Sequence, residues 1–317
     1  MSENNERIIQ PEIIGIDHGF KNIKTANYTF STAISELKGK PENLEDILEV
    51  EGRYFSLNGE PVFALDNHDK SNSEEFYLLT LVALAKELMF RKKQKANVVL
   101  VAGLPIKWYD RQKESFKKML LKNKELRFSF EGKKYFITID RVRILMQGVS
   151  AIGSEIQKYL DSYCVVVDIG GETIDVIPLE NGKPRVDECK IDTEASIFCI
   201  NDITEKIESE CYKKVREHEI ISAIINGRKV SGDSITNIIQ EELEKYAAKV
   251  MRKIKGFRFD LERTPIIFVG GGSYIIKNYG RYSETNTSFI LDINANAKGY
   301  ERTEKALILK SQRSRRG

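Results

Sequence analysis

The chain has 317 residues, of which 41% are hydrophobic and 31% are charged. This length exceeds a single typical hydrophobic core, so we expect two lobes. The 50 basic and 47 acidic residues nearly balance, and a net charge of +3 gives no general case for nucleic-acid binding.

Residue content and hydropathy argue against a zinc protein, a secreted protein and a membrane protein. Four cysteines without a CxxC pair and only three histidines do not indicate a zinc site, and free thiols fit a reducing compartment. The first seven residues are polar and acidic, unlike a signal peptide. The longest apolar region, 76–90, contains Lys86 and Glu87 and is too short to span a bilayer. We therefore expect a soluble, cytoplasmic protein with no membrane partner.

The first half of the chain predicts hairpins followed by helices and strands. Apolar periodicity and turn residues define the elements. In order, they are a hairpin or meander over 12–33, two short strands over 51–60 that close on Asn58-Gly59, a helix over 76–92 with an apolar stripe, a buried strand over 97–103, a surface helix over 108–122, a hairpin over 128–139 that turns at 131–133, a strand over 142–146 and a helix over 149–160.

The second half repeats this plan. Its predicted elements are a strand hairpin over 164–179, a turn at Asn181-Gly182, helical material from Ser196, a long helix over 234–254, a strand over 261–269, a short strand over 289–293 and a terminal helix over 294–309. Hairpins followed by alternating helix and strand thus occur twice. This repetition is typical of a duplicated α/β architecture.

Two of the predicted hairpins carry an aspartate next to a glycine-containing turn. Asp17 precedes the first turn and Asp168 precedes the second. Such turns direct backbone N–H groups outward, where they can bind a phosphate oxygen. Carboxylates and nucleotide phosphates are preferred partners of hydrated Mg²⁺. The sequence therefore predicts two phosphate-binding hairpins that face each other across a cleft.

A third element is a strongly apolar strand that runs into three glycines, 270–272, and then Ser273. Glycine allows the backbone to approach a ligand where a Cβ would collide. The alternative interpretation is a tight turn from strand to helix. The position of the triplet after the two hairpins favours ligand binding.

In this order the motifs resemble the five motifs of the superfamily of actin, sugar kinases and heat-shock chaperone ATPases. The two phosphate motifs correspond to 15–24 and 165–176, the adenosine motif to 266–277, and the two connecting helices to 146–160 and 295–309. The likeness spans nearly the whole chain. Within the superfamily the chain most resembles bacterial plasmid-segregation proteins of the ParM and Alp type. It is short, and its first motif reads Asp-x-Gly-x-x-Asn-x-Lys.

The resemblance implies a two-lobed α/β actin-like fold, with duplicated ribonuclease-H-like domains and a nucleotide cleft between them. Lobe I would comprise residues 1–146, with an inserted small subdomain at about 34–75, and would be completed by a helix over 300–310. Lobe II would comprise 147–299, with an inserted helical subdomain at about 200–258. Residues 311–317 would form a basic tail.

The resemblance also implies roles for individual residues. Asp17 and Asp168 would hold Mg²⁺ through water and, together with Gln147, form the catalytic set. The residues expected to bind nucleotide are Gly19, Phe20, Lys21, Asn22 and Lys24 in the first motif, Gly170, Gly171, Glu172 and Thr173 in the second, and Gly270, Gly271, Gly272 and Ser273 in the adenosine motif.

Three positions depart from the family pattern. Gln147 stands where many relatives have glutamate; it can orient water by hydrogen bonds but cannot act as a carboxylate base. The alternative for Gln147 is a polar residue at a helix N-terminus. His18 replaces a small or amide residue, and Phe20 replaces a serine or threonine, so only backbone N–H groups would bind phosphate there.

Contacts to the base would come from helices within 198–255. Asn201, Glu205 and Lys206 are candidates, and a solvated helix face is the alternative for each.

The function implied is that of a Mg²⁺-dependent ATPase that assembles into filaments and segregates or positions plasmid or other DNA. ATP, with GTP as the alternative, and Mg²⁺ would be the cofactors. Further copies of the chain and a DNA-binding adaptor would be the partners, with direct nucleic-acid contact only through the basic tail. The alternatives are a metabolic kinase or phosphatase of the same fold, which needs a general base that Gln147 does not supply, and a scaffold that binds nucleotide without cleaving it.

Overall fold

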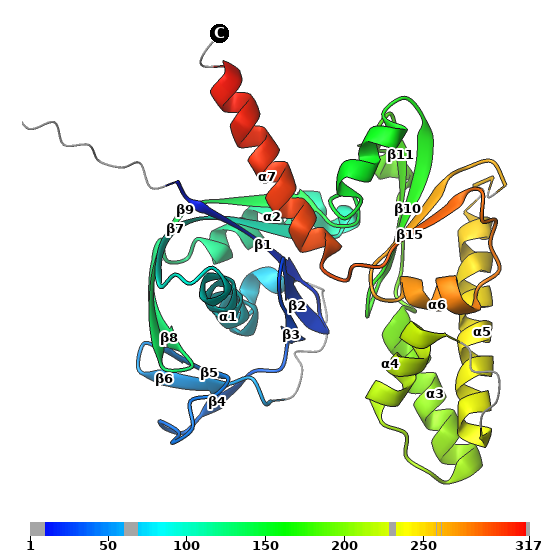
Figure 1. Cartoon of the computed structure of the whole chain (residues 1–317), viewed down its shortest axis with the longest axis horizontal. Helices are drawn as coiled ribbons and strands as arrows, with labels where there is room; N and C mark the ends of the chain where they lie inside the picture. The colour runs from blue at the N-terminus through cyan, green and yellow to red at the C-terminus, as the bar shows by residue number, and fades with distance from the viewer. Residues whose placement is uncertain (1–9, 60–68, 228–232, 258, 261, 315–317) are drawn as a thin grey trace, which may run out of the picture. The chain divides into compact units, whose positions relative to one another are not determined.

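The computed structural model describes residues 10–59, 69–227, 233–257, 259–260 and 262–314. The chain divides into two compact units, each with its own sheet (Figure 1). Unit 1 consists of Met1–Leu104, Trp108–Leu145 and Ala297–Gly317, and unit 2 consists of Pro105–Lys107 and Met146–Asn296. Among the described residues, no helix has both the length and the apolar character needed to cross a bilayer.

Unit 1 is built on a nine-stranded mixed sheet in the order β3-β2-β1-β7-β9-β8-β5-β6-β4. β1 pairs in parallel with β7 and antiparallel with β2. The elements of unit 1, some of whose end residues belong to unit 2, are β1 (Glu12–His18), β2 (Asn22–Thr25), β3 (Thr29–Ser31), β4 (Ser35–Leu37), β5 (Ile47–Val50), β6 (Arg53–Ser56), the 3₁₀ turn η1 (Lys70–Asn72), α1 (Glu74–Phe90), β7 (Lys95–Leu104), α2 (Ile106–Leu120), β8 (Glu125–Phe130), β9 (Lys133–Met146) and α7 (Ala295–Ser314).

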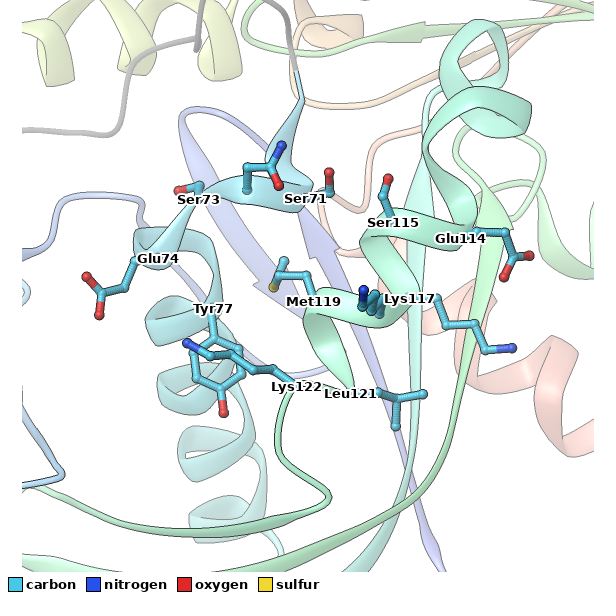
Figure 2. A pocket seen from close by; sticks show the side chains of 12 residues that line it. Ser71, Ser73, Glu74, Tyr77, Glu114, Ser115, Lys117, Met119, Leu121 and Lys122 are labelled. Atoms are coloured by element: carbon cyan, nitrogen blue, oxygen red, sulfur yellow. The ribbon is translucent and has the colours of Figure 1, made fainter.

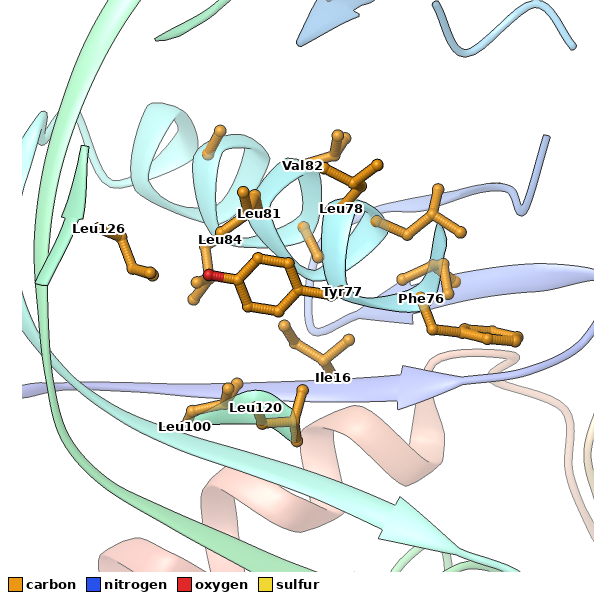
Figure 3. Close-up of a cluster of buried hydrophobic side chains, with 14 of the residues drawn as sticks. Ile16, Phe76, Tyr77, Leu78, Leu81, Val82, Leu84, Leu100, Leu120 and Leu126 are labelled. Atoms are coloured by element: carbon orange, nitrogen blue, oxygen red, sulfur yellow. The ribbon is translucent and has the colours of Figure 1, made fainter. Parts of the chain in front are cut away.

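Helix α1 is the centre of the unit 1 core, and the curved sheet encloses it (Figure 1). Figure 3 shows its side chains among those of β1, β7, β8 and α2. The predicted helix is confirmed, but the predicted single apolar stripe is wrong, because apolar side chains are buried on all of its faces. Even Glu87 is fully buried, and its carboxylate accepts from the Asn27 N–H at 2.9 Å and pairs with Arg91 at 3.2 Å.

Two tight turns of the sheet have positive φ at both of their loop residues. β5 and β6 are joined by Glu51-Gly52, with φ of 52° and 77°, the geometry of a two-residue type I′ turn. The prediction that this hairpin closes on Asn58-Gly59 is therefore wrong, because that pair follows β6; Glu60 lies outside the described residues. The predicted hairpin turn at 131–133 is confirmed, with positive φ at residues 131 and 132.

Helix α7 packs closely against the middle of the unit 1 sheet. A Cβ on Gly15 would lie 2.2 Å from the carbonyl oxygen of Ala297. Glu301 accepts from the Gly15 N–H at 3.4 Å and pairs with Arg91 at 2.8 Å. One turn further on, Glu304 is fully buried and binds two arginines of β9, 141 and 143. The absence of a side chain at position 15 thus has a packing reason.

Unit 2 has a six-stranded sheet with the path β12-β11-β10-β14-β15, and β13 pairs with β11. Its elements are the 3₁₀ helix η2 (Gly153–Tyr159), β10 (Tyr163–Ile169), β11 (Ile174–Glu180), β12 (Lys183–Pro184), the 3₁₀ turn η3 (Val186–Glu188), β13 (Lys190–Asp192), α3 (Ser196–Cys211), α4 (Glu217–Asn226), α5 (Ser234–Gly256), β14 (Ile266–Val269), α6 (Ser273–Tyr279) and β15 (Thr287–Ile290). Helices α3, α4, α5 and α6 pack on the core formed by β10, β11 and β14 (Figure 1). The predicted Asn181-Gly182 turn is confirmed between β11 and β12.

The first connecting helix is not an α-helix. The apolar periodicity predicts it over 149–160, and the family resemblance implies it over 146–160. Residues 147–152 form turns, and η2 is a 3₁₀ helix. Gly148 has φ of 72° and Gly153 has φ of 46°, so both glycines take left-handed conformations that an α-helix cannot contain. Of the apolar residues expected to face inward, Ile152 is buried, but Leu160 is 41% exposed. The glycines determine the backbone here.

We predict that Gly15→Ala lowers the free energy of unfolding by about 1 to 3 kcal/mol, because the new methyl group would meet a backbone oxygen that cannot rotate away. Gly39→Ala is the matched control, since a Cβ there meets nothing within 4 Å. Urea unfolding followed by circular dichroism measures both. Equal stabilities of the two variants would contradict the close approach of α7.

Candidate functional site

The first hairpin joins β1 to β2 through residues 19–21. Asp17 lies opposite Lys24 in the pairing register, and the Lys24 Nζ is 3.6 Å from the Asp17 Oδ2. Asp17 is buried, at 3% exposed, so its charge depends on this partner and on other polar groups near it. Asn22 begins β2, and a Cβ on Gly19 would lie 2.6 Å from the Asn22 carbonyl oxygen. The predicted residues of this motif therefore lie in one tight hairpin.

The carbonyl groups of this turn are engaged by the protein itself. The Thr32 hydroxyl donates to the Phe20 carbonyl at 2.6 Å, and the Thr32 N–H donates to the Lys21 carbonyl at 3.1 Å. The ammonium of Lys70 donates to the His18 carbonyl. In a planar trans peptide the following N–H points away from its carbonyl, so this arrangement directs the Lys21 N–H to the opposite side. Sequence reasoning missed Thr32 and Lys70.

Phe20 has a structural role that explains its departure from the family pattern. Its ring is buried, packs edge-on to Phe76 with centroids 5.9 Å apart, and lies 4.1 Å from the Lys70 ammonium. An aromatic face attracts a cation, so the ring partly compensates for the burial of this lysine. The side chain of Phe20 is therefore part of the core, and its backbone alone belongs to the loop.

His18 is fully buried beside the same lysine. Its Nε2 lies 2.9 Å from the Thr80 hydroxyl, which itself donates to the Phe76 carbonyl at 2.7 Å. Because the hydroxyl proton is used there, Nε2 must be the donor. Burial, and next the charge of Lys70, lower the pKa of His18 to about 3. The imidazole is neutral at pH 7 and adds no positive charge to the loop.

The second hairpin, between β10 and β11, has the same plan. The strands pair as far as Ile169 and Ile174, and residues 170–173 form the loop. A backbone hydrogen bond of 2.9 Å from the first to the last loop residue closes it. Asp168 precedes the loop and is 9% exposed.

The first residues of α3 engage the carbonyls of the second loop. The Ser196 hydroxyl donates to the Gly170 carbonyl at 2.7 Å, and the Ile197 N–H donates to the Gly171 carbonyl at 2.9 Å. Among the described residues, the N–H of Gly171 finds no acceptor. Glu172 is half-buried in the same loop. The second loop thus has its carbonyls held inward, as the first does, although different residues hold them.

Asp168 and Asp175 occupy opposite positions in the β10–β11 register, so both side chains lie on one face of the hairpin. Both are nearly buried, and the Thr173 hydroxyl donates to the Asp175 Oδ2 at 3.0 Å. Like charges that face each other are destabilising unless donors or a cation offset them. Carboxylate oxygens are ligands that Mg²⁺ prefers, so this donor set fits that ion.

Two glycines of the triplet pack against β10, and the third has open space beside it. Gly270 has φ of 86°, and a Cβ on it would lie 2.5 Å from the Asp168 Oδ1; one on Gly272 would lie 2.2 Å from the Ile169 side chain. Both glycines are therefore required by the end of β10. A Cβ on Gly271 would meet only an atom 4.0 Å away. Ser273 is buried, and its hydroxyl donates to the Val269 carbonyl. The open backbone position in this motif is Gly271.

Gln147 lies in a tight turn directly after β9 and is half-buried. The Val149 N–H donates to the Gln147 carbonyl at 2.8 Å, across Gly148. The Gly148 N–H donates to the side-chain oxygen of Asn296 at 2.9 Å, and the amide nitrogen of Asn296 donates to the Asp168 Oδ2 at 3.1 Å. Sequence reasoning missed Gly148 and Asn296; the Gln147-Gly148 dipeptide at a strand end was the only signal.

The candidates for base contacts all lie on α3. Asn201 and Glu205 are exposed, and Lys206 pairs with Glu242 of α5 at 2.6 Å. The lysine therefore links two helices of unit 2, and the other two side chains face solvent.

Unit 1 also has a pocket of about 920 Å³ that contains none of the predicted site residues. Figure 2 shows it between the start of α1 and the second half of α2. Lys117, Lys118 and Lys122 line it, and the Lys122 ammonium lies 5.5 Å from the Tyr77 ring. Lysines on one side of a surface helix are typical of a solvated face, so the candidate site rests on the hairpins.

Two protein families match consecutive parts of the chain. Residues 15–149 match the family described as actin like proteins, N terminal domain, and residues 166–279 match the C-terminal family of the archaeal actin homologue MreB-like proteins. The chain belongs to the actin-like protein family. The first match contains the first hairpin, and the second contains the second hairpin and the glycine triplet.

Solved structures share the fold of this actin-like protein. The actin-like protein Alp7A is 19% identical, with 96% of this chain and 99% of that one covered and a TM-score of 0.74. The archaeal actin homologue Ta0583 is 21% identical, with 93% and 99% covered and a TM-score of 0.73. ParM of Bacillus thuringiensis, solved with ATP, is 18% identical, with 94% and 98% covered and a TM-score of 0.69. The predicted two-lobed α/β actin-like fold is confirmed. No curated protein sequence matches the chain.

We predict that acid destabilises this actin-like protein through His18. Its pKa is lowered in the folded state, so the stabilising effect is fully present above pH 6.5 and is lost as the pH falls towards 3. Between pH 7.5 and pH 4.5 the expected loss is about 2 to 3 kcal/mol, which His18→Gln should abolish. Urea unfolding at a series of pH values measures this loss.

His218→Gln is the control for that experiment, because it removes an exposed imidazole of α4. It should keep the wild-type pH dependence. If His18→Gln also keeps it, the buried neutral state of His18 is wrong.

Proposed function

We propose that this actin-like protein is a Mg²⁺-dependent ATPase that assembles with its own copies into filaments and segregates or positions plasmid or other DNA in the cytoplasm. The observation that carries the proposal is the shared plan of two hairpins, one in each unit. Each has a buried aspartate at the end of a strand and a glycine-containing loop whose carbonyls are held inward. ATP is the proposed nucleotide, with GTP as the alternative.

The proposed nucleotide contacts follow from the groups that the two loops leave outward. Backbone N–H groups at Lys21 and Gly171 would bind phosphate oxygens, and Lys24 would add a positive charge. Gly271, where a Cβ would have room, leaves space for the approach of the adenosine part. The hydroxyls of Thr173 and Ser273 are occupied within the protein, so their contribution would come from the backbone.

Asp17 and Asp168 are the residues that would hold Mg²⁺ through water, and Asp175 shares the face of Asp168. When bound, the ion neutralises phosphate charge and makes the terminal phosphorus easier to attack. Gln147 would orient the attacking water by donating and accepting hydrogen bonds. Because glutamine does not ionise, it cannot take the proton of that water, which favours slow hydrolysis.

Two of the similar structures support the nucleotide and assembly parts of the proposal. Ta0583 was solved in complex with ADP, and the pCBH ParM structure is described as a non-polymerisable quadruple mutant. A contact between different surfaces of identical subunits produces a filament when its repetition does not close into a ring. A DNA-binding adaptor would connect the filament to its cargo.

Light scattering and phosphate release, measured together over a range of protein concentrations, test the function. We expect scattering to rise when ATP and Mg²⁺ are added and phosphate release to increase above a threshold concentration. A flat trace with sugar-dependent turnover would instead favour a metabolic kinase. Nucleotide binding with no release at any concentration would favour a scaffold, and calorimetry without binding of ATP or GTP in Mg²⁺ would reject the proposal altogether.

The site assignment predicts that Asp168→Ala lowers the hydrolysis rate on the order of 100-fold, because it removes a carboxylate that holds the water around Mg²⁺. Asp187→Ala is the control, since it removes an exposed carboxylate of the same unit. Single-turnover phosphate release measures both, and circular dichroism checks that each variant is folded. Wild-type turnover in folded Asp168→Ala protein would show that the site lies elsewhere.

A further inference from the structure

Asn296 connects two parts of the candidate site that are far apart in the sequence. Its side chain is 8% exposed and makes two hydrogen bonds within unit 2. The oxygen accepts from the Gly148 N–H at 2.9 Å, and the nitrogen donates to the Asp168 Oδ2 at 3.1 Å. An N–H needs an acceptor and a carboxylate needs a donor, so these two partners fix the orientation of the amide.

The hydrogen bond between Gly148 and Asn296 stabilises the backbone turn beside Gln147. With φ of 72° at Gly148 and a hydrogen bond between the residues on either side, this is a γ-turn with positive φ, a rare and strained form. Such a turn persists only where its surroundings hold it. The acceptor that Asn296 offers to the Gly148 N–H is one such constraint, and it acts one residue after the proposed water-orienting glutamine.

The hydrogen bond from Asn296 to Asp168 fixes the orientation of the Asp168 carboxylate. A donor on Oδ2 fixes the rotation of the carboxylate group and offsets part of the repulsion from Asp175 across the hairpin. Oδ1 points towards the backbone at Gly270, where only glycine fits. Asp168 is therefore held from two sides.

The Asn296 amide is not used to cap its own helix. The turn before α7 is held by Asp292, whose side chain accepts from the Asn294 N–H at 3.0 Å and whose carbonyl accepts from the Ala295 N–H at 2.9 Å. The amide of Asn296 is thus available for the two site contacts. A helix that only needed to begin here would not require an asparagine at this position.

We propose that Asn296 is a positioning residue for nucleotide hydrolysis, which holds the Mg²⁺-binding carboxylate of Asp168 and the turn that carries Gln147 in one fixed arrangement. This inference rests on the proposed function. It adds that the two groups depend on each other through a single amide, so that loss of this amide disturbs both without removing either.

Three variants test the inference. Asn296→Ala removes both hydrogen bonds. Asn296→Asp keeps an acceptor for Gly148, and its carboxyl can donate to Asp168 only while it is protonated. Asn278→Ala is the control, because this asparagine of unit 2 likewise makes two side-chain hydrogen bonds, which it donates to the carbonyls of Ile224 at 2.7 Å and Ile225 at 3.2 Å.

We expect Asn296→Ala to lower the single-turnover rate about 10- to 100-fold while the nucleotide Kd from calorimetry stays close to that of wild type. Asn278→Ala should keep the wild-type rate. In the Gln147→Ala background, Asn296→Ala should cost clearly less than it does alone, because part of its effect acts through the glutamine. Full additivity of the two substitutions would overturn the coupling.

The aspartate variant separates the two hydrogen bonds of the amide. A carboxylate at position 296 can still accept from the Gly148 N–H, but it offers no donor to Asp168 and adds a negative charge beside it. We expect Asn296→Asp to lower the single-turnover rate at least as much as Asn296→Ala does, while circular dichroism shows a folded protein. A wild-type rate in folded Asn296→Asp protein would contradict the inference, even if Asn296→Ala fails to fold.

The two levels of failure are distinguishable. If wild type hydrolyses neither ATP nor GTP, the proposed function is wrong, and this inference fails with it. If wild type hydrolyses nucleotide and Asn296→Ala does so at the same rate, the proposed function stands and the inference alone is wrong.

Discussion

The two loops depend on one interaction: donors inside the protein bind the loop carbonyls. A carbonyl oxygen that faced a phosphate would repel it, whereas an N–H attracts it. In the first loop the donors are Thr32 and Lys70; in the second they are Ser196 and Ile197 at the start of α3. The same constraint is met by unrelated residues, which indicates that the backbone orientation, rather than any particular side chain, is the common requirement.

The hairpins, their aspartates and most helices could be predicted because the signals are local. Apolar alternation and turn glycines lie within a few residues of the structure that they determine. Two donors of the site could not be predicted: Lys70, which binds the first loop, lies 52 residues from His18, and Asn296, which binds the Asp168 carboxylate, lies 128 residues from it. Such pairs are determined by tertiary packing, which one sequence does not reveal.

The errors in the prediction have physical reasons as well. Glu51-Gly52 and Asn58-Gly59 both suit a two-residue turn, and the pairing of β5 with β6 decides between them. The apolar spacing after β9 suits a helix, but Gly148 and Gly153 adopt positive φ. In the glycine triplet, two residues satisfy the packing of β10 and only Gly271 has open space. The three glycines of this motif therefore serve different structural purposes.

The contacts of Glu304 have a practical consequence for the end of the chain. Its buried carboxylate binds Arg141 and Arg143, so α7 cannot slide by one turn along the sheet without leaving an unpaired buried charge. A shortened version of the chain that stops before this residue would leave both arginines without their carboxylate. Fluorescent or affinity fusions at the carboxyl end therefore need the whole of α7, and a linker should begin beyond Ser314.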